Sequence, residues 1–159
     1  MFRIIKWLIA LPLGAFIFFN AYVYGNIITY RAVAPNKTAF MAMRMRQFQS
    51  EGKDVALDYR WVPYDRISVN LKKALIASED AKFAEHGGFD WGGIQYAIKR
   101  NKQSGEVKAG GSTISQQLAK NLFLNESRSY IRKGEEAAIT AMMEAVTDKD
   151  RIFELYLNS

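Results

Sequence analysis

The chain has 159 residues, 49% of them hydrophobic, and a formal net charge of +6. This length allows one domain and an anchor. The absence of cysteine excludes disulfide bonds and thiolate metal sites, so the redox compartment is left open. The charge is uneven, because residues 92–133 contain eight Lys and Arg but only two Glu. Such a basic stretch indicates an anionic partner (phosphate, nucleic acid or an acidic lipid surface) or, alternatively, a solvated helical face.

The segment from Trp7 to Tyr30 contains no charged residue, and its 24 residues are enough to form a membrane-spanning helix. At 1.5 Å per residue it exceeds a bilayer core of about 30 Å. Arg3 and Lys6 precede it, which predicts a cytoplasmic N-terminus and export of the remainder. The alternative is a cleaved signal peptide, since residues 32–34 (Ala-Val-Ala) fit a cleavage site. The apolar region is longer than the roughly 7–15 residues typical of signal peptides, which favours an anchor.

Residues 31–60 form a weakly periodic, membrane-proximal segment, in which Met41, Met43 and Met45 fit either core packing or contact with a membrane surface. From residue 61 to residue 159 the apolar pattern predicts one helical domain with no convincing strand. Ser68 is a candidate N-cap for the first of its helices. The predicted helices cover residues 68–80, 91–102, 113–122, 131–146 and 150–158. The sequence therefore predicts a mostly α protein with an anchor at residues 1–30.

Four short blocks carry the functional signal. They read EDAKFAEHGG at 79–88, GGSTISQQLAKN at 110–121, RKGEE at 132–136 and KDRIFELYLN at 149–158. In this order and at this spacing they resemble the peptidoglycan glycosyltransferases. That family has a lysozyme-like fold and polymerises lipid II into glycan strands, releasing undecaprenyl diphosphate. The resemblance covers residues 62–158, and it rests on the four blocks together because no single block is decisive.

Two glutamates are the candidate catalytic residues. Glu79 lies near a predicted helix end beside Asp80, where a neighbouring acid and the helix C-terminus both favour the protonated carboxyl group. That environment suits a general base, although an exposed Glu-Asp pair on a helix end is the plainer interpretation. The resemblance implies that Glu79 activates the 4-hydroxyl of the acceptor sugar. It also implies that Glu136, which shares a helix face with Arg132 and Lys133, acts near the donor pyrophosphate.

The resemblance extends to a set of predicted substrate contacts. Ser112 and Thr113 precede a helix, where they suit either anion binding or simple N-capping. The following helix carries a polar stripe, which is either its solvent-exposed face or a surface that binds the sugar and phosphates of the substrate. His86, the only histidine, is interpreted as a positioning residue, and Glu154 as support for the fold. The full predicted set is Asp80, Phe83, His86, Ser112, Thr113, Gln117, Lys120, Asn121, Arg128, Arg132 and Lys133.

The sequence contains no glycine-rich nucleotide loop, H-E-x-x-H motif or metal-ligand cluster, so no cofactor is established. The resemblance implies that a divalent cation, Mg²⁺ or Mn²⁺, is one option near the pyrophosphate. The implied partners are lipid II, the growing glycan strand, membrane lipid and other cell-wall synthesis or cell-division proteins, and not nucleic acid. The implied location is the bacterial inner membrane, crossed once, with the catalytic part on the periplasmic side and a role in cell shape.

The match departs from the family pattern at its end. Family members continue beyond the fourth block with further helices and a last motif, so we expect this chain to be truncated at its C-terminus. Two alternatives to polymerisation follow. One is a lysozyme-like enzyme that cleaves glycan, and the other is a membrane-anchored scaffold that truncation has made inactive.

Overall fold

The structure is a computed structural model that describes residues 2–106, 110–127 and 129–159, without the side chains of residues 2–5 and 9. Within these ranges the chain forms seven α-helices and a short 3₁₀ turn, and no strand. This confirms the mostly α prediction. In chain order the elements are α1 (Phe2–Tyr30), α2 (Ala39–Ser50), η1 (Tyr64–Arg66), α3 (Val69–Glu79), α4 (Trp91–Ser104), α5 (Ile114–Phe123), α6 (Tyr130–Val146) and α7 (Lys149–Leu157).

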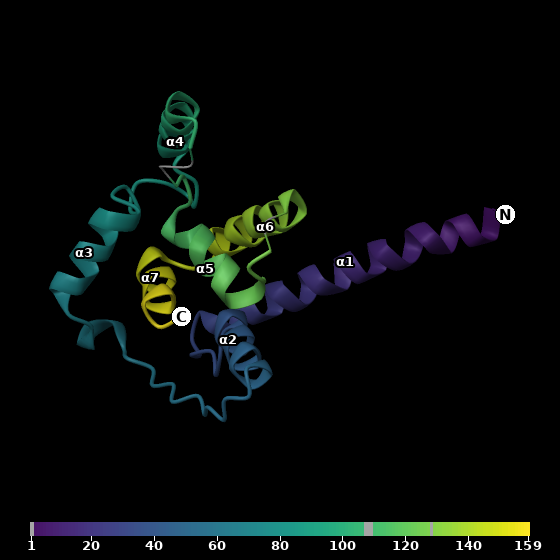
Figure 1. The fold of residues 1–159 in the computed structure, drawn as a ribbon, viewed down its shortest axis with the longest axis horizontal. Helices are drawn as coiled ribbons and strands as arrows, with labels where there is room; N and C mark the ends of the chain where they lie inside the picture. The colour runs from purple at the N-terminus through teal and green to yellow at the C-terminus, as the bar shows by residue number, and fades with distance from the viewer. Residues whose placement is uncertain (1, 107–109, 128) are drawn as a thin grey trace.

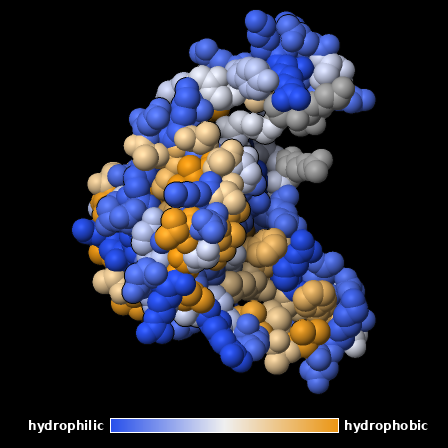
Figure 2. Space-filling model, turned by 90° about the vertical axis from the view of Figure 1, so that its left-hand side faces the viewer, coloured by the Kyte–Doolittle hydropathy of each residue, from blue (hydrophilic) through white to orange (hydrophobic). Residues whose placement is uncertain are grey.

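Helix α5 is the centre of the domain, with α6, α7 and α2 packed around it and with α3 and α4 further out (Figure 1). The apolar repeat that predicted it explains this position. Ile114 and Leu118 are fully buried and Leu122 nearly so, which places one continuous apolar face in the core. Viewed as a surface, the molecule is hollowed between the end that carries α4 and the end that carries α2 (Figure 2).

Helices α3 to α7 agree with the predicted ranges to within a few residues. Two local features differ from the sequence interpretation. Ser68 occupies the N-cap position of α3, but its side chain makes no capping hydrogen bond. Helix α2 falls in the weakly periodic segment, where it begins because the Thr38 hydroxyl accepts a hydrogen bond from Met41 N at 3.1 Å. No residue of α2 is buried, so its methionines are not core residues.

Helix α1 has two parts with different environments. Its first part projects away from the domain (Figure 1), and residues such as Leu8 and Phe18 are 68% and 77% exposed. In its second part Val23 and Ile27 join the same hydrophobic core as α5. Lys6–Tyr30 is the one helix in the described ranges that is long and apolar enough to cross a membrane. The domain core thus extends across the predicted boundary at residue 30.

This packing predicts that truncating Ile27 destabilises the domain, whereas truncating its neighbour Ile28 does not. Ile27 is 3% exposed and Ile28 is 40% exposed. Burial of this kind makes Ile27→Ala cost about 2–5 kcal/mol. At about 2–4 °C per kcal/mol this lowers the Tm by roughly 4–20 °C. Thermal unfolding of both full-length variants in detergent measures the difference, and equal melting temperatures would contradict a core role for α1.

Candidate active site

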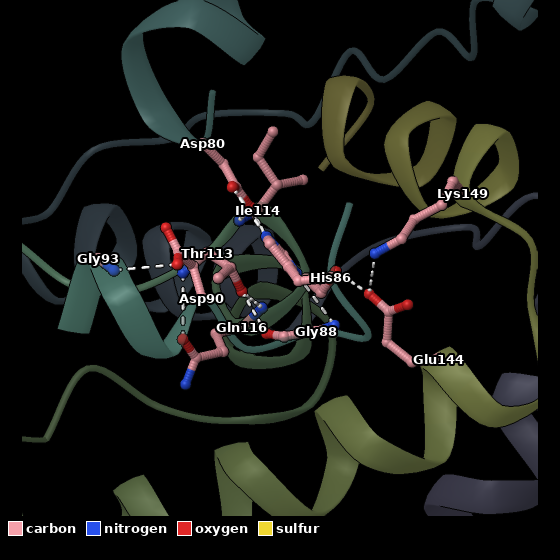
Figure 3. A network of polar contacts seen from close by, with 11 residues as sticks. Asp80, His86, Gly88, Asp90, Gly93, Thr113, Ile114, Gln116, Glu144 and Lys149 are labelled. Carbon is pink, nitrogen blue, oxygen red and sulfur yellow. Dashed lines mark hydrogen bonds and ion pairs between the residues drawn. The ribbon is translucent and has the colours of Figure 1, made fainter. Parts of the chain in front are cut away.

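The Asp80 carboxylate joins the first two sequence blocks (Figure 3). Asp80 follows the last residue of α3, and its Oδ2 accepts a hydrogen bond from Ile114 N, in the first turn of α5, at 3.1 Å. Its Oδ1 lies 2.9 Å from His86 Nε2, and its side chain is only 3% exposed. A buried carboxylate with these partners fixes the end of α3 against the start of α5.

His86 and Thr113 hold the glycine turn between them. Gly88 N donates to His86 Nδ1 at 3.2 Å, so the neutral imidazole carries its proton on Nε2 and donates it to Asp80. Thr113 Oγ1 donates to Gly88 O at 2.7 Å and also forms a capping box with Gln116. The contacts agree with the interpretation of His86 as a positioning residue. The buried hydroxyl of Thr113 is therefore an N-cap in this structure.

Glu79 is exposed and is oriented by residues from two other helices. Its Oε2 accepts a hydrogen bond from Gln117 Nε2 at 3.0 Å. Gln117 Oε1 in turn accepts from the Tyr156 hydroxyl at 3.3 Å. Burial, and secondarily the negative charge of Glu79, raise the pKa of Tyr156, so this phenol remains a donor. Sequence reasoning did not single out Tyr156 although it lies in the fourth block.

Glu136 is buried on α6 between two cations. Arg132 Nη1 donates to its Oε2 at 2.7 Å, and Lys133 Nζ pairs with its Oε1. Lys133 Nζ also donates to Ser112 Oγ at 2.9 Å, which ties the third block to the second. The predicted shared helix face is therefore present. Because Glu136 is 3% exposed and both oxygens have partners, it acts here as an anchor for the two cations.

A cleft of about 380 Å³ lies between the end of α3, the start of α4 and the loop before α5. Residues from the first two blocks line it, so it brings together the candidate base and the glycine-rich loop. Lys133 reaches this cleft through its bond to Ser112. The lining residues include Glu79, Asp80, Lys82, Asp90, Tyr96, Gly111, Ser112 and Thr113.

The remaining predicted contacts have different surroundings. Phe83 is 3% exposed and packs against Phe153 with ring centroids 5.6 Å apart, so in this structure it serves the core and not the cleft. Asn121 Nδ2 donates to Ser159 Oγ at 3.3 Å. Lys120 is half-buried and forms no ion pair with any described residue. Arg128 lies outside the described residues. Glu154 accepts from Tyr64 N at 2.8 Å and pairs with Arg151, as expected of a residue that supports the fold.

A second polar cluster, which sequence reasoning missed, stabilises the same turn from the other side (Figure 3). Glu144 on α6 accepts hydrogen bonds from Ser115 Oγ and from Lys149 Nζ, the latter at 2.7 Å. The Lys149 ammonium also lies 4.6 Å from the centroid of the Phe83 ring. A Cβ at Gly88 would lie 2.9 Å from Glu144 Cγ. Helix α6 therefore packs directly on the backbone of the glycine turn.

The described residues do not form a protein-built metal site. No three carboxylate or imidazole side chains converge within those ranges. Both oxygens of Glu136 accept from cationic side chains. A divalent cation stays a prediction of the resemblance, and no chemical step below depends on it.

Comparison with known proteins agrees with this architecture. The chain matches the protein family described as Transglycosylase over residues 44–159. The "Biosynthetic peptidoglycan transglycosylase" of Neisseria meningitidis serogroup C (strain 053442) is 89% identical over 100% of this chain and 68% of that protein. Proteins of the same name from Neisseria meningitidis serogroup B (strain ATCC BAA-335 / MC58) and Neisseria gonorrhoeae (strain NCCP11945) are 88% and 86% identical, with the same coverage. The chain therefore belongs to the transglycosylase family, and the resemblance indicated by the four blocks is confirmed.

The two adjacent glycines of this turn should differ in how much their substitution by alanine destabilises the domain. Gly88 has φ +90°, and an added Cβ would lie 2.8 Å from Thr140 Cγ2, whereas Gly87 has open space around it and no positive φ. We expect Gly88→Ala to destabilise the domain by about 2–6 kcal/mol, from backbone strain and overpacking together. Gly87→Ala is the matched control and changes stability by less than about 0.5 kcal/mol. Thermal melts that fail to separate the two variants would contradict this tight contact.

Proposed function

We propose that this chain is a membrane-anchored glycosyltransferase that polymerises lipid II into glycan strands during cell-wall synthesis. The observation that carries the proposal is the exposed carboxylate of Glu79 at a cleft, held by Gln117 and flanked by the cation-bearing third block. Membership of the transglycosylase family and the names of the similar Neisseria proteins support it. The first two of the four blocks that suggested the family line this cleft, and the third is joined to it by the hydrogen bond from Lys133 to Ser112.

The proposed reaction needs one base and a stabilised leaving group. The 4-hydroxyl oxygen of the acceptor sugar attacks C1 of the donor sugar, and Glu79 takes the hydroxyl proton. The bond between C1 and the donor phosphate oxygen breaks, and undecaprenyl diphosphate leaves with that electron pair. Gln117 and Tyr156 keep the Glu79 carboxylate aimed into the cleft, because each donates a hydrogen bond in the direction of the base.

The cations of the second and third blocks suit the leaving diphosphate. Lys120 lies one turn beyond Gln117 on α5, on the same face of the helix. Arg132 and Lys133 share the charge of Glu136, so this group of three carries a net positive charge. Preorganised cations of this kind stabilise negative charge that develops as a phosphate leaves. Glu136 is accordingly proposed as a positioning residue for the diphosphate site.

Helix α1 supports the proposed location. It is apolar and exposed over its first part, and Lys6 precedes the uncharged stretch. The positive-inside rule then places the N-terminus in the cytoplasm and the cleft on the periplasmic side of the inner membrane. A substrate with a lipid anchor requires an enzyme at the bilayer surface, and this arrangement provides it.

The decisive experiment incubates the full-length protein in detergent with labelled lipid II and separates the products by size. Wild-type protein should form polymer, and Glu79→Gln should reduce its rate about 10²–10⁴-fold with an unchanged melting temperature. The substitution keeps the shape of the side chain and its bond to Gln117, while removing the base. Release of fragments from preformed glycan, without polymer, would instead indicate the cleaving enzyme, and near-normal polymerisation by the variant would remove Glu79 from the mechanism.

Lys120→Ala should weaken lipid II binding without affecting folding, because Lys120 has no ion-pair partner among the described residues. We expect a loss of about tenfold, equivalent to one charge-assisted hydrogen bond. Increasing salt should weaken wild-type binding more than binding by the variant. Arg132→Ala is a poor substitute, because it leaves a buried Glu136 short of a partner and so costs stability. Unchanged affinity of Lys120→Ala for lipid II would mean that Lys120 does not bind the substrate and belongs only to the solvent-exposed side of α5.

A further inference from the structure

Two adjoining hollows run along α1, and none of their lining residues lines the catalytic cleft. The larger, of about 830 Å³, lies between α1, α2 and the end of α5, and its walls include Met43, Arg46 and Phe123. The smaller, of about 230 Å³, lies between α1 and α6, and its walls include Phe16 and Ile131. Phe19 and Glu135 line both hollows, so the two are continuous at these residues.

The polarity of the two hollows changes along α1. The larger combines apolar side chains with the polar groups of Arg46, Gln47, Ser50 and Asn125. The smaller is mostly apolar, with Phe16, Ala138 and Ile139 in its wall, and its polar members are Asn20 and Glu135. The apolar hollow extends to Phe16, nearer the start of α1, whereas the polar one is lined by residues of α2. Together they have the profile of an amphiphile, with its tail directed along the anchor.

The depth of α1 in a bilayer places the apolar hollow among lipid chains. Phe19 is about 18 Å along the helix from Trp7, at 1.5 Å per residue. A hydrocarbon core of about 30 Å that begins near Trp7 therefore has Phe16 near its middle and Phe19 in the leaflet on the side of the domain. Ile131, on the first turn of α6, is 79% exposed in the same hollow. An exposed apolar residue at this depth has lipid, not water, as its neighbour.

The charges of the larger hollow specify the head group. Arg46 and Glu135 both line it, and neither forms an ion pair with any residue that the structure describes. Glu135 is half-buried, which makes an unpaired carboxylate costly unless a cation reaches it. A ligand that carries one negative and one positive group would satisfy both side chains. A head group with phosphate alone would leave Glu135 unpaired beside a like charge.

We infer that the two hollows bind one zwitterionic phospholipid of the phosphatidylethanolamine type from the surrounding bilayer. Its phosphate pairs with Arg46, its ammonium pairs with Glu135, and an acyl chain follows Phe19 and Phe16 along α1. The isoprenoid diphosphate of the proposed substrate has no ammonium group and does not meet this charge pattern. The inference rests on the proposed passage of α1 through a membrane, and not on glycosyl transfer.

The test uses delipidated full-length protein in detergent and measures retained lipid by native mass spectrometry. The probes are dioleoylphosphatidylethanolamine, dioleoylphosphatidylglycerol and undecaprenyl diphosphate. We expect one phosphatidylethanolamine per chain, bound about tenfold more tightly than phosphatidylglycerol, because only the former supplies a charge-assisted bond to Glu135. Glu135→Gln should remove this preference by weakening phosphatidylethanolamine alone, and Arg46→Gln should weaken both phospholipids.

Two matched controls separate the site from general surface charge. Arg44 lies on the same helix but does not line the hollow, and Glu126 is an exposed acid outside both hollows. Arg44→Gln and Glu126→Gln should leave lipid binding unchanged, and melting temperatures should show that all four variants fold. Equal binding of the two phospholipids, equal loss in Arg44→Gln, or displacement by undecaprenyl diphosphate at lower concentration would overturn the inference. Vesicle flotation tests α1 separately, so failure of the anchor is distinguishable from failure of the site.

Discussion

The buried carboxylate of Asp80 is the constraint on which the rest of the site depends. It binds the first turn of α5 and the ring of His86 at once, so the end of α3, the glycine turn and the start of α5 have one relative placement. Glu79 precedes Asp80 directly and shares that placement, which brings its carboxylate within 3.0 Å of Gln117. A base on an exposed helix end would otherwise sample many positions, and the rigid neighbour removes that freedom.

Hydrogen bonds of α7 link the site to helix α1 in the same way. Arg151 on α7 donates to the carbonyl oxygens of Tyr30 and Val33, at 2.7 and 3.0 Å, and its guanidinium lies over the ring of Trp61. Helix α7 also carries Tyr156, the outermost member of the chain of hydrogen bonds that leads to Glu79. One short helix therefore contacts the end of α1 directly and reaches the candidate base through Gln117. With Val23 and Ile27 in the core, α1 is a structural part of the helical domain.

Sequence reasoning succeeded where the signal is local and failed where it depends on how helices cross. The apolar repeat over residues 113–122 predicted α5 to within one residue, because a single period decides which face is buried. Helix α2 had no such repeat, because none of its residues is buried. Glu144 and Tyr156 meet their partners across 29 and 39 residues of sequence, and no local pattern reports such contacts. The conspicuous position of Phe83 in a motif gave no indication that its ring belongs to the core.

The cationic surface is also smaller and better defined than a count of charges suggests. The sequence between residues 92 and 133 has an excess of six positive charges, yet two of those cations, Arg132 and Lys133, converge on the buried carboxylate of Glu136. This pairing lowers the net charge that a diphosphate would meet. It also fixes two long side chains that would otherwise lose rotamer freedom on binding, at up to about 2 kcal/mol each. A site for a doubly charged leaving group benefits more from two cations in fixed positions than from a larger number of mobile ones, because their electrostatic effect then needs no reorganisation during the reaction.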